Sequence, residues 1–120
     1  MNQVLVVDDH FDVRQLLHIA LGREFEILDA DNGVDALNAV LHHNPRVVLL
    51  DVMMPGKLDG LQVLDAIKSD RRCMDTFVAV ISARDQQADK DEAYRFGADA
   101  YFTKPFSPIS LVNWVRARFQ

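Results

Sequence analysis

The stretch RVVLLD, residues 46–51, predicts a strand that is buried on both faces and ends at an aspartate. Two further apolar runs, QVLVV at 3–7 and FVAVI at 77–81, have the same composition and also end at polar residues. Strands without an alternating polar face are typical of a parallel sheet that helices cover on both sides. The three runs therefore indicate the centre of an α/β sheet.

Weaker strand patterns and helical patterns fill the rest of the chain. We expect strands at 3–7, 25–29, 46–50, 77–81 and 100–103, and helices at 11–22, 33–43, 60–69, 86–96 and 107–119. This alternation predicts a doubly wound (βα)5 three-layer sandwich. The second strand carries Glu26 and Asp29 and the fifth is short, so both belong at edges. Right-handed crossovers then give a parallel five-stranded sheet in the flavodoxin-like order 2-1-3-4-5.

Four residues mark expected helix ends. Asn32 and Ser107 are suitable N-caps because their side chains can accept from the first free backbone N–H groups. Gly22 and Gly97 follow helical patterns, so we expect both to close helices with a positive φ.

Composition indicates a single domain over residues 1–120, with 49% hydrophobic and 26% charged residues. Thirteen basic residues against eighteen acidic ones give a net charge of −5, which argues against direct binding to nucleic acid or an anionic membrane. No apolar run approaches the roughly 20 residues that a bilayer requires. The single cysteine, Cys73, which we place in a polar loop as a bystander thiol, fits a reducing, cytoplasmic location.

Polar residues follow four of the five strands. They are Asp8 and Asp9 after the first, Asp51 after the third, Ser82 after the fourth and Lys104 after the fifth. Carboxyl ends of parallel strands share one edge of the sheet, so these side chains should meet where the winding reverses. Three clustered carboxylates need a compensating charge, which a divalent cation and a lysine can supply. Oxygen ligands in an open site suit Mg²⁺ better than zinc.

Each of these residues also has an ordinary structural interpretation. Asp8 or Asp9 could cap the following helix, Ser82 could cap the fourth, and Lys104 could be a solvated loop residue. Taken singly, such interpretations are adequate. Four separate strand ends converging on this set are improbable as unrelated caps.

The whole chain resembles the receiver domain of two-component response regulators, the CheY-like family. The matching motifs are LVVDD at 5–9, LLDVMMPG at 49–56 followed by DGL at 59–61, VISA at 80–83, GADAYFTKPF at 97–106 and the closing SPISLVNWVRARF. The resemblance implies a phosphoacceptor module that catalyses only its own phosphorylation and dephosphorylation. One departure is a longer loop after Asp51, with Lys57 and Leu58 before Asp59.

The resemblance implies a role for each residue at the predicted edge. Asp51 would be the phosphoacceptor, and Asp8, Asp9, Asp51 and the backbone carbonyl of Met53 would bind Mg²⁺, Asp9 directly and Asp8 through water.

The resemblance also assigns the remaining polar positions. Ser82 and Lys104 would contact the phosphoryl group, and Ser82 with Tyr101 would form a conformational switch. The Lys104–Pro105 peptide bond is expected to be cis.

The partners implied are a histidine kinase or phosphotransfer protein, and an output domain or target protein. The output surface would be the helix at 86–96, the strand at 100–103 and the helix at 107–119, where we expect Tyr101, Trp114 and Arg116 to cluster. Partial burial of Trp114 against the fifth strand is an equal alternative to a docking role. A second copy of the chain is a further expected partner, in a homodimer that depends on phosphorylation. The chain is either a single-domain regulator or part of a larger one.

Two other classes of protein use related sheets. A haloacid-dehalogenase-type phosphatase needs a second aspartate two residues after its nucleophile, where this chain has Met53. A flavin carrier needs a Ser/Thr-rich phosphate loop after the first strand, where Asp8, Asp9 and His10 would repel the phosphate. A phosphorelay histidine is also disfavoured, because His42 and His43 are explained by their place at a helix end.

Overall fold

The computed structural model describes residues 2–54, 56 and 58–120 and contains a five-stranded parallel sheet in the order β2-β1-β3-β4-β5. The strands are β1 (Gln3–Val7), β2 (Glu26–Ala30), β3 (Val47–Asp51), β4 (Phe77–Ser82) and β5 (Ala100–Thr103). The helices are α1 (Phe11–Leu21), α2 (Gly33–His43), α3 (Gly60–Lys68), α4 (Gln87–Arg95) and α5 (Pro108–Ala117), with a short 3₁₀ turn at Arg71–Cys73. The predicted fold class and strand order are confirmed.

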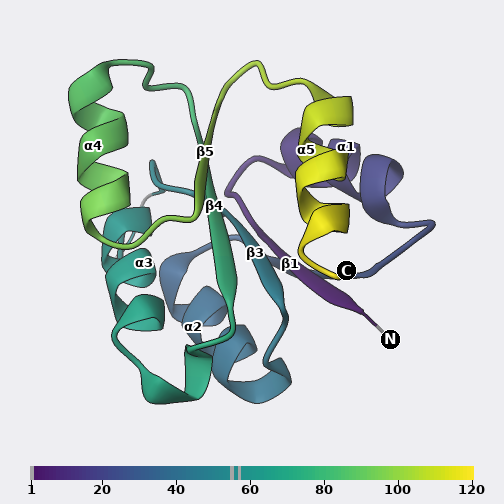
Figure 1. The fold of residues 1–120 in the computed structure, drawn as a ribbon, viewed down its shortest axis with the longest axis horizontal. Helices are drawn as coiled ribbons and strands as arrows, with labels where there is room; N and C mark the ends of the chain where they lie inside the picture. Colours follow the sequence, from purple (N-terminus) through teal and green to yellow (C-terminus); the bar gives the residue numbers. More distant parts are fainter. Residues whose placement is uncertain (1, 55, 57) are drawn as a thin grey trace.

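Helices cover both faces of the sheet (Figure 1). Helices α1 and α5 pack together on one face, and α2, α3 and α4 cover the other. Side chains along β1 alternate between the two cores: Leu5 and Val7 join the core under α2 and α3, while Val4 and Val6 join the core under α1 and α5. All four are fully buried, which explains why the central strands lack a polar face.

β2, β3 and β4 each end one residue later than predicted, and for the two central strands the added residue is polar. β3 continues to Asp51, which pairs with Ile81, and β4 continues to Ser82, which pairs with Thr103. A search for apolar runs stops at Asp51 and Ser82 because their side chains are polar. The backbone hydrogen bonds between strands do not depend on side-chain polarity, so both strands continue. Asp51 and Ser82 are therefore fixed by the sheet and not by loops.

The expected helix ends are largely confirmed. The Asn32 side chain accepts from the Asp35 backbone N–H at 2.9 Å, and the Ser107 side chain accepts from the Ser110 N–H at 3.3 Å. Gly97 has a φ of 104°. Gly22 is the C-cap of α1 as expected, but the predicted positive φ is wrong: its φ is −66°, and a Cβ there would lie 2.4 Å from the His18 carbonyl oxygen.

Cys73 is buried, with 2% of its surface exposed, so its predicted place in a polar loop is also wrong. The 3₁₀ turn folds its side chain into the core under α2 and α3, among Ile67 and other apolar residues. Burial raises the pKa of its thiol, which keeps the sulfur protonated and unreactive.

The expected cluster of Tyr101, Trp114 and Arg116 does not form. Trp114 packs edge-on against Phe102 of β5, with ring centroids 6.2 Å apart, which confirms its partial burial. Tyr101, the neighbouring residue on β5, packs against the opposite core. Arg116 turns towards the loop between α1 and β2, where its Nε donates to a Glu24 carboxylate oxygen at 2.9 Å. Alternation along β5 separates Tyr101 from Trp114.

The predicted long loop after β3 leads into α3. Of that loop, Pro55 and Lys57 lie outside the described residues. Asp59 begins α3 with a capping box: its side chain accepts from the Gln62 N–H, and the Gln62 side chain accepts from the Asp59 N–H, each at 2.9 Å.

Gly60 allows the start of α3 to lie directly against the end of β3. A Cβ at Gly60 would lie 2.2 Å from Val52 Cα and 2.4 Å from the Asp51 carbonyl oxygen. These are backbone atoms that cannot rotate away. Glycine is therefore required for α3 to begin beside Asp51.

We predict that Gly60→Ala lowers the free energy of unfolding by about 1–3 kcal/mol, since the added methyl group displaces backbone. Urea unfolding measures the change. Asp65→Ala, at an exposed position of the same helix, is the control and should change stability by less than about 0.5 kcal/mol. Equal midpoints for Gly60→Ala and the wild type would show that the contact is not required.

Candidate functional site

Four strands deliver polar side chains to one edge of the sheet, at its carboxyl end. Asp8 follows β1 and its backbone N–H donates to the Ala30 carbonyl of β2 at 3.1 Å. Lys104 follows β5 and its backbone N–H donates to the Ser82 carbonyl of β4 at 2.7 Å. Hydrogen bonds to neighbouring strands thus hold the first residues beyond the sheet in place.

Two carboxylates at this edge are almost entirely buried. Asp8 is 2% exposed and Asp51 is 3% exposed. The Lys104 Nζ donates to Asp8 Oδ2 at 2.9 Å and to Asp51 Oδ2 at 3.5 Å. Asp9 lies beside them, and the potential ligand atoms of Asp8, Asp9, Asp51 and His10 lie within 4.8 Å of one another. The structure therefore brings the predicted carboxylates and lysine together.

Burial and neighbouring charges set the pKa values of Asp51 and Lys104 in opposite balance. It raises the pKa of Asp51, and the nearby charge of Asp8 adds to this effect. The Met53 backbone N–H, which donates to Asp51 Oδ1 at 2.9 Å, and the Lys104 ammonium act in the opposite direction without cancelling it. Burial lowers the pKa of Lys104, but its hydrogen bond to Asp8 and the charge of Asp51 outweigh burial and raise it. Lys104 is therefore a permanent cation at this site.

The donor set fits a hard divalent cation. Three carboxylates face one lysine, so the cluster keeps an excess of negative charge. Asp9 Oδ1 is buried and accepts no hydrogen bond from the residues that the structure describes. A buried oxygen without a donor is costly unless a cation or an ordered water satisfies it. Its place among Asp8 and Asp51 is what a Mg²⁺ site requires.

Ser82 and Tyr101 meet through the backbone of Arg84. The fully buried Ser82 Oγ accepts from the Arg84 N–H at 3.1 Å, and the Tyr101 hydroxyl donates to the Arg84 carbonyl at 2.7 Å. Tyr101 is half-buried. One residue of the β4–α4 loop thus contacts both members of the predicted switch pair.

The remaining sequence expectations concern backbone positions. The Lys104–Pro105 peptide bond is cis, as predicted. The role of the Met53 carbonyl as a metal ligand stays a prediction, and the exposed Met53 side chain takes no part in the cluster.

Three residues at the site escaped sequence reasoning. The His10 Nδ1 lies 3.1 Å from Asp8 Oδ1, and the Arg14 Nη1 donates to the Asp8 carbonyl at 2.8 Å. Arg84 acts through its backbone, which no sequence pattern reveals. The adjacency of His10 to the two aspartates was a usable signal, whereas Arg14 reaches back over a turn of α1 that only the fold defines.

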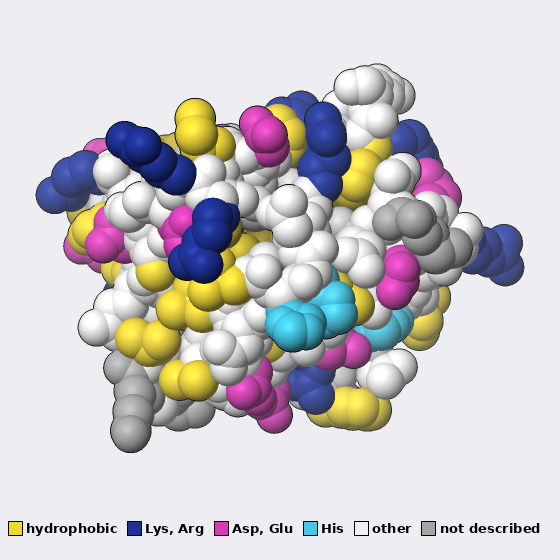
Figure 2. Space-filling model, turned by 90° about the horizontal axis from the view of Figure 1, so that it is seen from below, with side chains coloured by type: hydrophobic (Ala, Val, Ile, Leu, Met, Phe, Trp, Pro, Cys, Tyr) yellow, Lys and Arg dark blue, Asp and Glu magenta, His cyan; other side chains and the backbone are white. Residues whose placement is uncertain are grey.

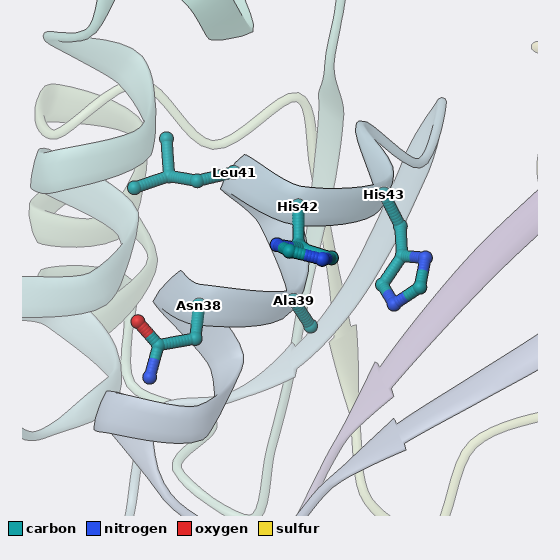
Figure 3. A pocket seen from close by; sticks show the side chains of 5 residues that line it. All are labelled: Asn38, Ala39, Leu41, His42 and His43. Carbon is teal, nitrogen blue, oxygen red and sulfur yellow. The ribbon is translucent and has the colours of Figure 1, made fainter.

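A hollow on α2 holds none of this chemistry. Its lining residues are Asn38, Ala39, Leu41, His42 and His43, all on the last turns of α2 (Figure 3). The rings of His42 and His43 meet edge to face with centroids 5.5 Å apart. Among the described residues, no other helix or strand contributes a side chain to this hollow, so a ligand there would contact α2 alone.

The end of the molecule opposite the carboxylate cluster has a mixed surface. Figure 2 shows Lys and Arg side chains interspersed with Asp and Glu on this face. A face of this kind lacks the continuous positive field that nucleic acid binding requires. Among the helices described, none combines the length and the apolar composition needed to cross a bilayer.

A doubly wound sheet with a carboxylate cluster and a lysine at its carboxyl edge defines a receiver-type domain. Residues 4–116 match the family described as the response regulator receiver domain, and the chain belongs to this family. Members act in two-component signalling, bind Mg²⁺ at an acidic pocket and are generally not classical enzymes. The family implies a phosphoryl-accepting aspartate.

Individual proteins are similar over nearly the whole chain. The transcriptional regulatory protein SrrA of Staphylococcus aureus is 37% identical over 117 residues, which is 97% of this chain and 47% of SrrA. The chain thus spans about half the length of the curated relatives it matches.

Solved structures show the same fold. The BeF3-activated receiver domain of DrrB, a Thermotoga maritima OmpR/PhoB homolog, superposes with a TM-score of 0.90 at 28% identity, covering 99% of this chain and 97% of that one. The chemotaxis protein CheY4 of Vibrio cholerae gives 0.88 at 26% identity, with 98% of each chain covered.

We predict that Asp51→Asn stabilises the protein at neutral pH in the absence of divalent cations. Because the pKa of Asp51 is raised, the folded protein holds this proton more tightly than the unfolded chain does. The unfolding free energy of the wild type therefore falls as pH rises from the ordinary carboxyl range through the raised pKa. The variant lacks this loss and should have the higher urea midpoint at pH 7.

The difference should shrink as the pH is lowered, since the wild-type carboxyl then becomes neutral too. Asp75→Asn, at an exposed aspartate, is the matched control and should show no such pH-dependent gap. A gap that stayed constant over the acidic range would contradict the assignment to Asp51.

Proposed function

We propose that this chain accepts a phosphoryl group on Asp51 in a Mg²⁺-dependent reaction and changes its partner binding as a result. The observation that carries the proposal is the buried Asp51 carboxylate at the end of the central strand, beside Asp8, Asp9 and the Lys104 ammonium. A carboxylate in this position is a nucleophile whose charge is already opposed by fixed groups. A haloacid-dehalogenase-type phosphatase is not favoured, because Met53 stands where that class needs its second acid.

The reaction forms a bond between an Asp51 carboxylate oxygen and the phosphorus of the donor. The bond from phosphorus to the donor's imidazole nitrogen breaks, and its electron pair stays with the imidazole. Lys104 can pair with a phosphoryl oxygen, and Ser82 can offer its hydroxyl as a donor. Most of the rate enhancement in such transfers comes from position and electrostatics.

Mg²⁺ would be held by Asp8, Asp9, Asp51 and the Met53 carbonyl. When bound, it supplies positive charge that offsets the repulsion between the carboxylate and the incoming phosphoryl group. Asp9 contributes the buried oxygen that accepts no hydrogen bond from the described residues, and Arg14 steadies the main chain through the Asp8 carbonyl. Mg²⁺ should bind before phosphorylation, because the carboxylate cluster is complete without a phosphoryl group.

Response regulators interact with kinases and with output domains. For this chain, the proposed donor is a histidine kinase or a phosphotransfer protein. The proposed output surface is α4, β5 and α5, which would meet an output domain, a target protein or a second copy of the chain. SrrA is a transcriptional regulatory protein, and an output of that kind is one instance.

The proposed link from Asp51 to this surface passes through Ser82, Arg84 and Tyr101. A phosphoryl oxygen that drew the Ser82 hydroxyl towards itself would break its hydrogen bond with the Arg84 N–H. The Arg84 backbone also accepts from Tyr101, so the tyrosine would respond. The phosphoryl group shifts this equilibrium only as far as it binds one arrangement more tightly.

We predict that acetyl phosphate with Mg²⁺ adds one phosphoryl group to the wild type and none to Asp51→Asn. The reason is that Asp51 is the nucleophile at the cluster. Intact-protein mass spectrometry gives the result, and Asp75→Asn is the matched control that should label fully. Undiminished labelling of Asp51→Asn would overturn the proposed phosphoacceptor.

We predict that beryllofluoride, which mimics the acyl phosphate, shifts amide resonances at Arg84, along β5 and in α5, as well as near Asp51. If the coupling is typical, partner binding or self-association through that surface strengthens by about 1–3 kcal/mol. Heteronuclear NMR and sedimentation measure the two effects. Shifts confined to the surroundings of Asp51 would exclude this route.

A further inference from the structure

His10 begins α1 without capping it. It occupies the N-cap position, yet its side chain makes no hydrogen bond to the first turn of the helix. The imidazole turns back towards the carboxylates, where Nδ1 lies 3.1 Å from Asp8 Oδ1 and 3.2 Å from Asp9 Oδ1. The ring is 66% exposed, so packing does not hold it there.

These distances match neighbouring ligands of one cation. Ligand atoms about 2.1 Å from an octahedral ion lie about 3 Å from their neighbours in the same shell. Nδ1 stands at this separation from an oxygen of Asp8 and from the buried oxygen of Asp9 that accepts no hydrogen bond within the described part of the chain. Without a cation, Nδ1 is within hydrogen-bond distance of Asp8 Oδ1, a contact that requires the proton on Nδ1. When a cation takes the place of that proton, Nε2 at the exposed side of the ring would carry the proton instead and Nδ1 would offer its lone pair.

We propose that His10 is a nitrogen ligand of the divalent cation at this cluster. The inference rests on the proposed metal site and specifies its selectivity. Carboxylate and carbonyl oxygens suit Mg²⁺ and Mn²⁺, whereas imidazole favours later divalent ions such as Co²⁺ and Ni²⁺. With His10 added, the site accepts Co²⁺ in preference to Mg²⁺ more strongly than its oxygen ligands alone would.

The alternative is an ion pair in which a protonated His10 neutralises Asp8 and Asp9. That arrangement places a positive charge beside the metal position, so the ring would have to leave when a cation binds. The two arrangements differ in whether nitrogen is bonded to the ion.

Pulsed EPR of bound Mn²⁺ tests this difference directly. We expect the wild type to show a ¹⁴N coupling that His10→Phe loses, since phenylalanine keeps a ring of similar size without its nitrogens. His42→Phe makes the same change at an exposed histidine on α2 and should keep the coupling. Calorimetry should show the preference for Co²⁺ over Mg²⁺ falling about tenfold in His10→Phe and remaining unchanged in His42→Phe.

The result that overturns the inference is Mn²⁺ binding without a nitrogen coupling, or with one that persists in His10→Phe. If Asp9→Ala still weakens Mg²⁺ binding in that case, the proposed metal site stands and only the role of His10 is wrong. If the wild type binds neither ion, or Asp9→Ala binds as well as the wild type, the proposed metal site fails and the inference falls with it.

Discussion

The ion pairs that Lys104 makes with Asp8 and Asp51 are the constraint on which the site depends. Both carboxylates are nearly excluded from water, and a buried carboxylate without a partner costs several kcal/mol. The lysine that faces them is 96 residues away from Asp8 in the chain. β1, β3, β4 and β5 must all be in register before these charges meet. Electrostatic compensation at this edge therefore requires the completed sheet.

Much of this arrangement could be predicted because burial and periodicity act locally. Apolar runs locate the central strands, and the carboxyl ends of parallel strands must share an edge, so Asp8, Asp51 and Lys104 could be grouped before any coordinates were known. The strand ends were predicted one residue short at Asp51 and Ser82, because polarity ends an apolar pattern while backbone pairing continues.

Features that depend on how distant elements approach one another could not be predicted in this way. Cys73 sits among charged neighbours in the sequence, yet the 3₁₀ turn directs it into the core. Arg116 pairs with Glu24 because α1 lies beside α5, and Tyr101 and Trp114 separate because β5 alternates its faces. The direction of the His10 ring depends on how α1 leaves the sheet. Each of these follows from tertiary geometry and not from local composition.

The contact between Gly60 and the end of β3 makes the surroundings of Asp51 mechanically unequal. On the α3 side, the helix backbone at Gly60 lies directly against the backbone of Asp51 and Val52, so there is no space for Asp51 to move in that direction. Towards β4 and β5, the neighbours are the rotatable hydroxyls of Ser82 and Tyr101, joined through one loop residue. Backbone contact therefore limits movement of Asp51 towards α3, whereas towards β4 and β5 two side-chain hydroxyls can rotate to new partners. Close backbone packing at Gly60 therefore means that any movement at the end of the central strand is directed away from α3 and towards β4 and β5.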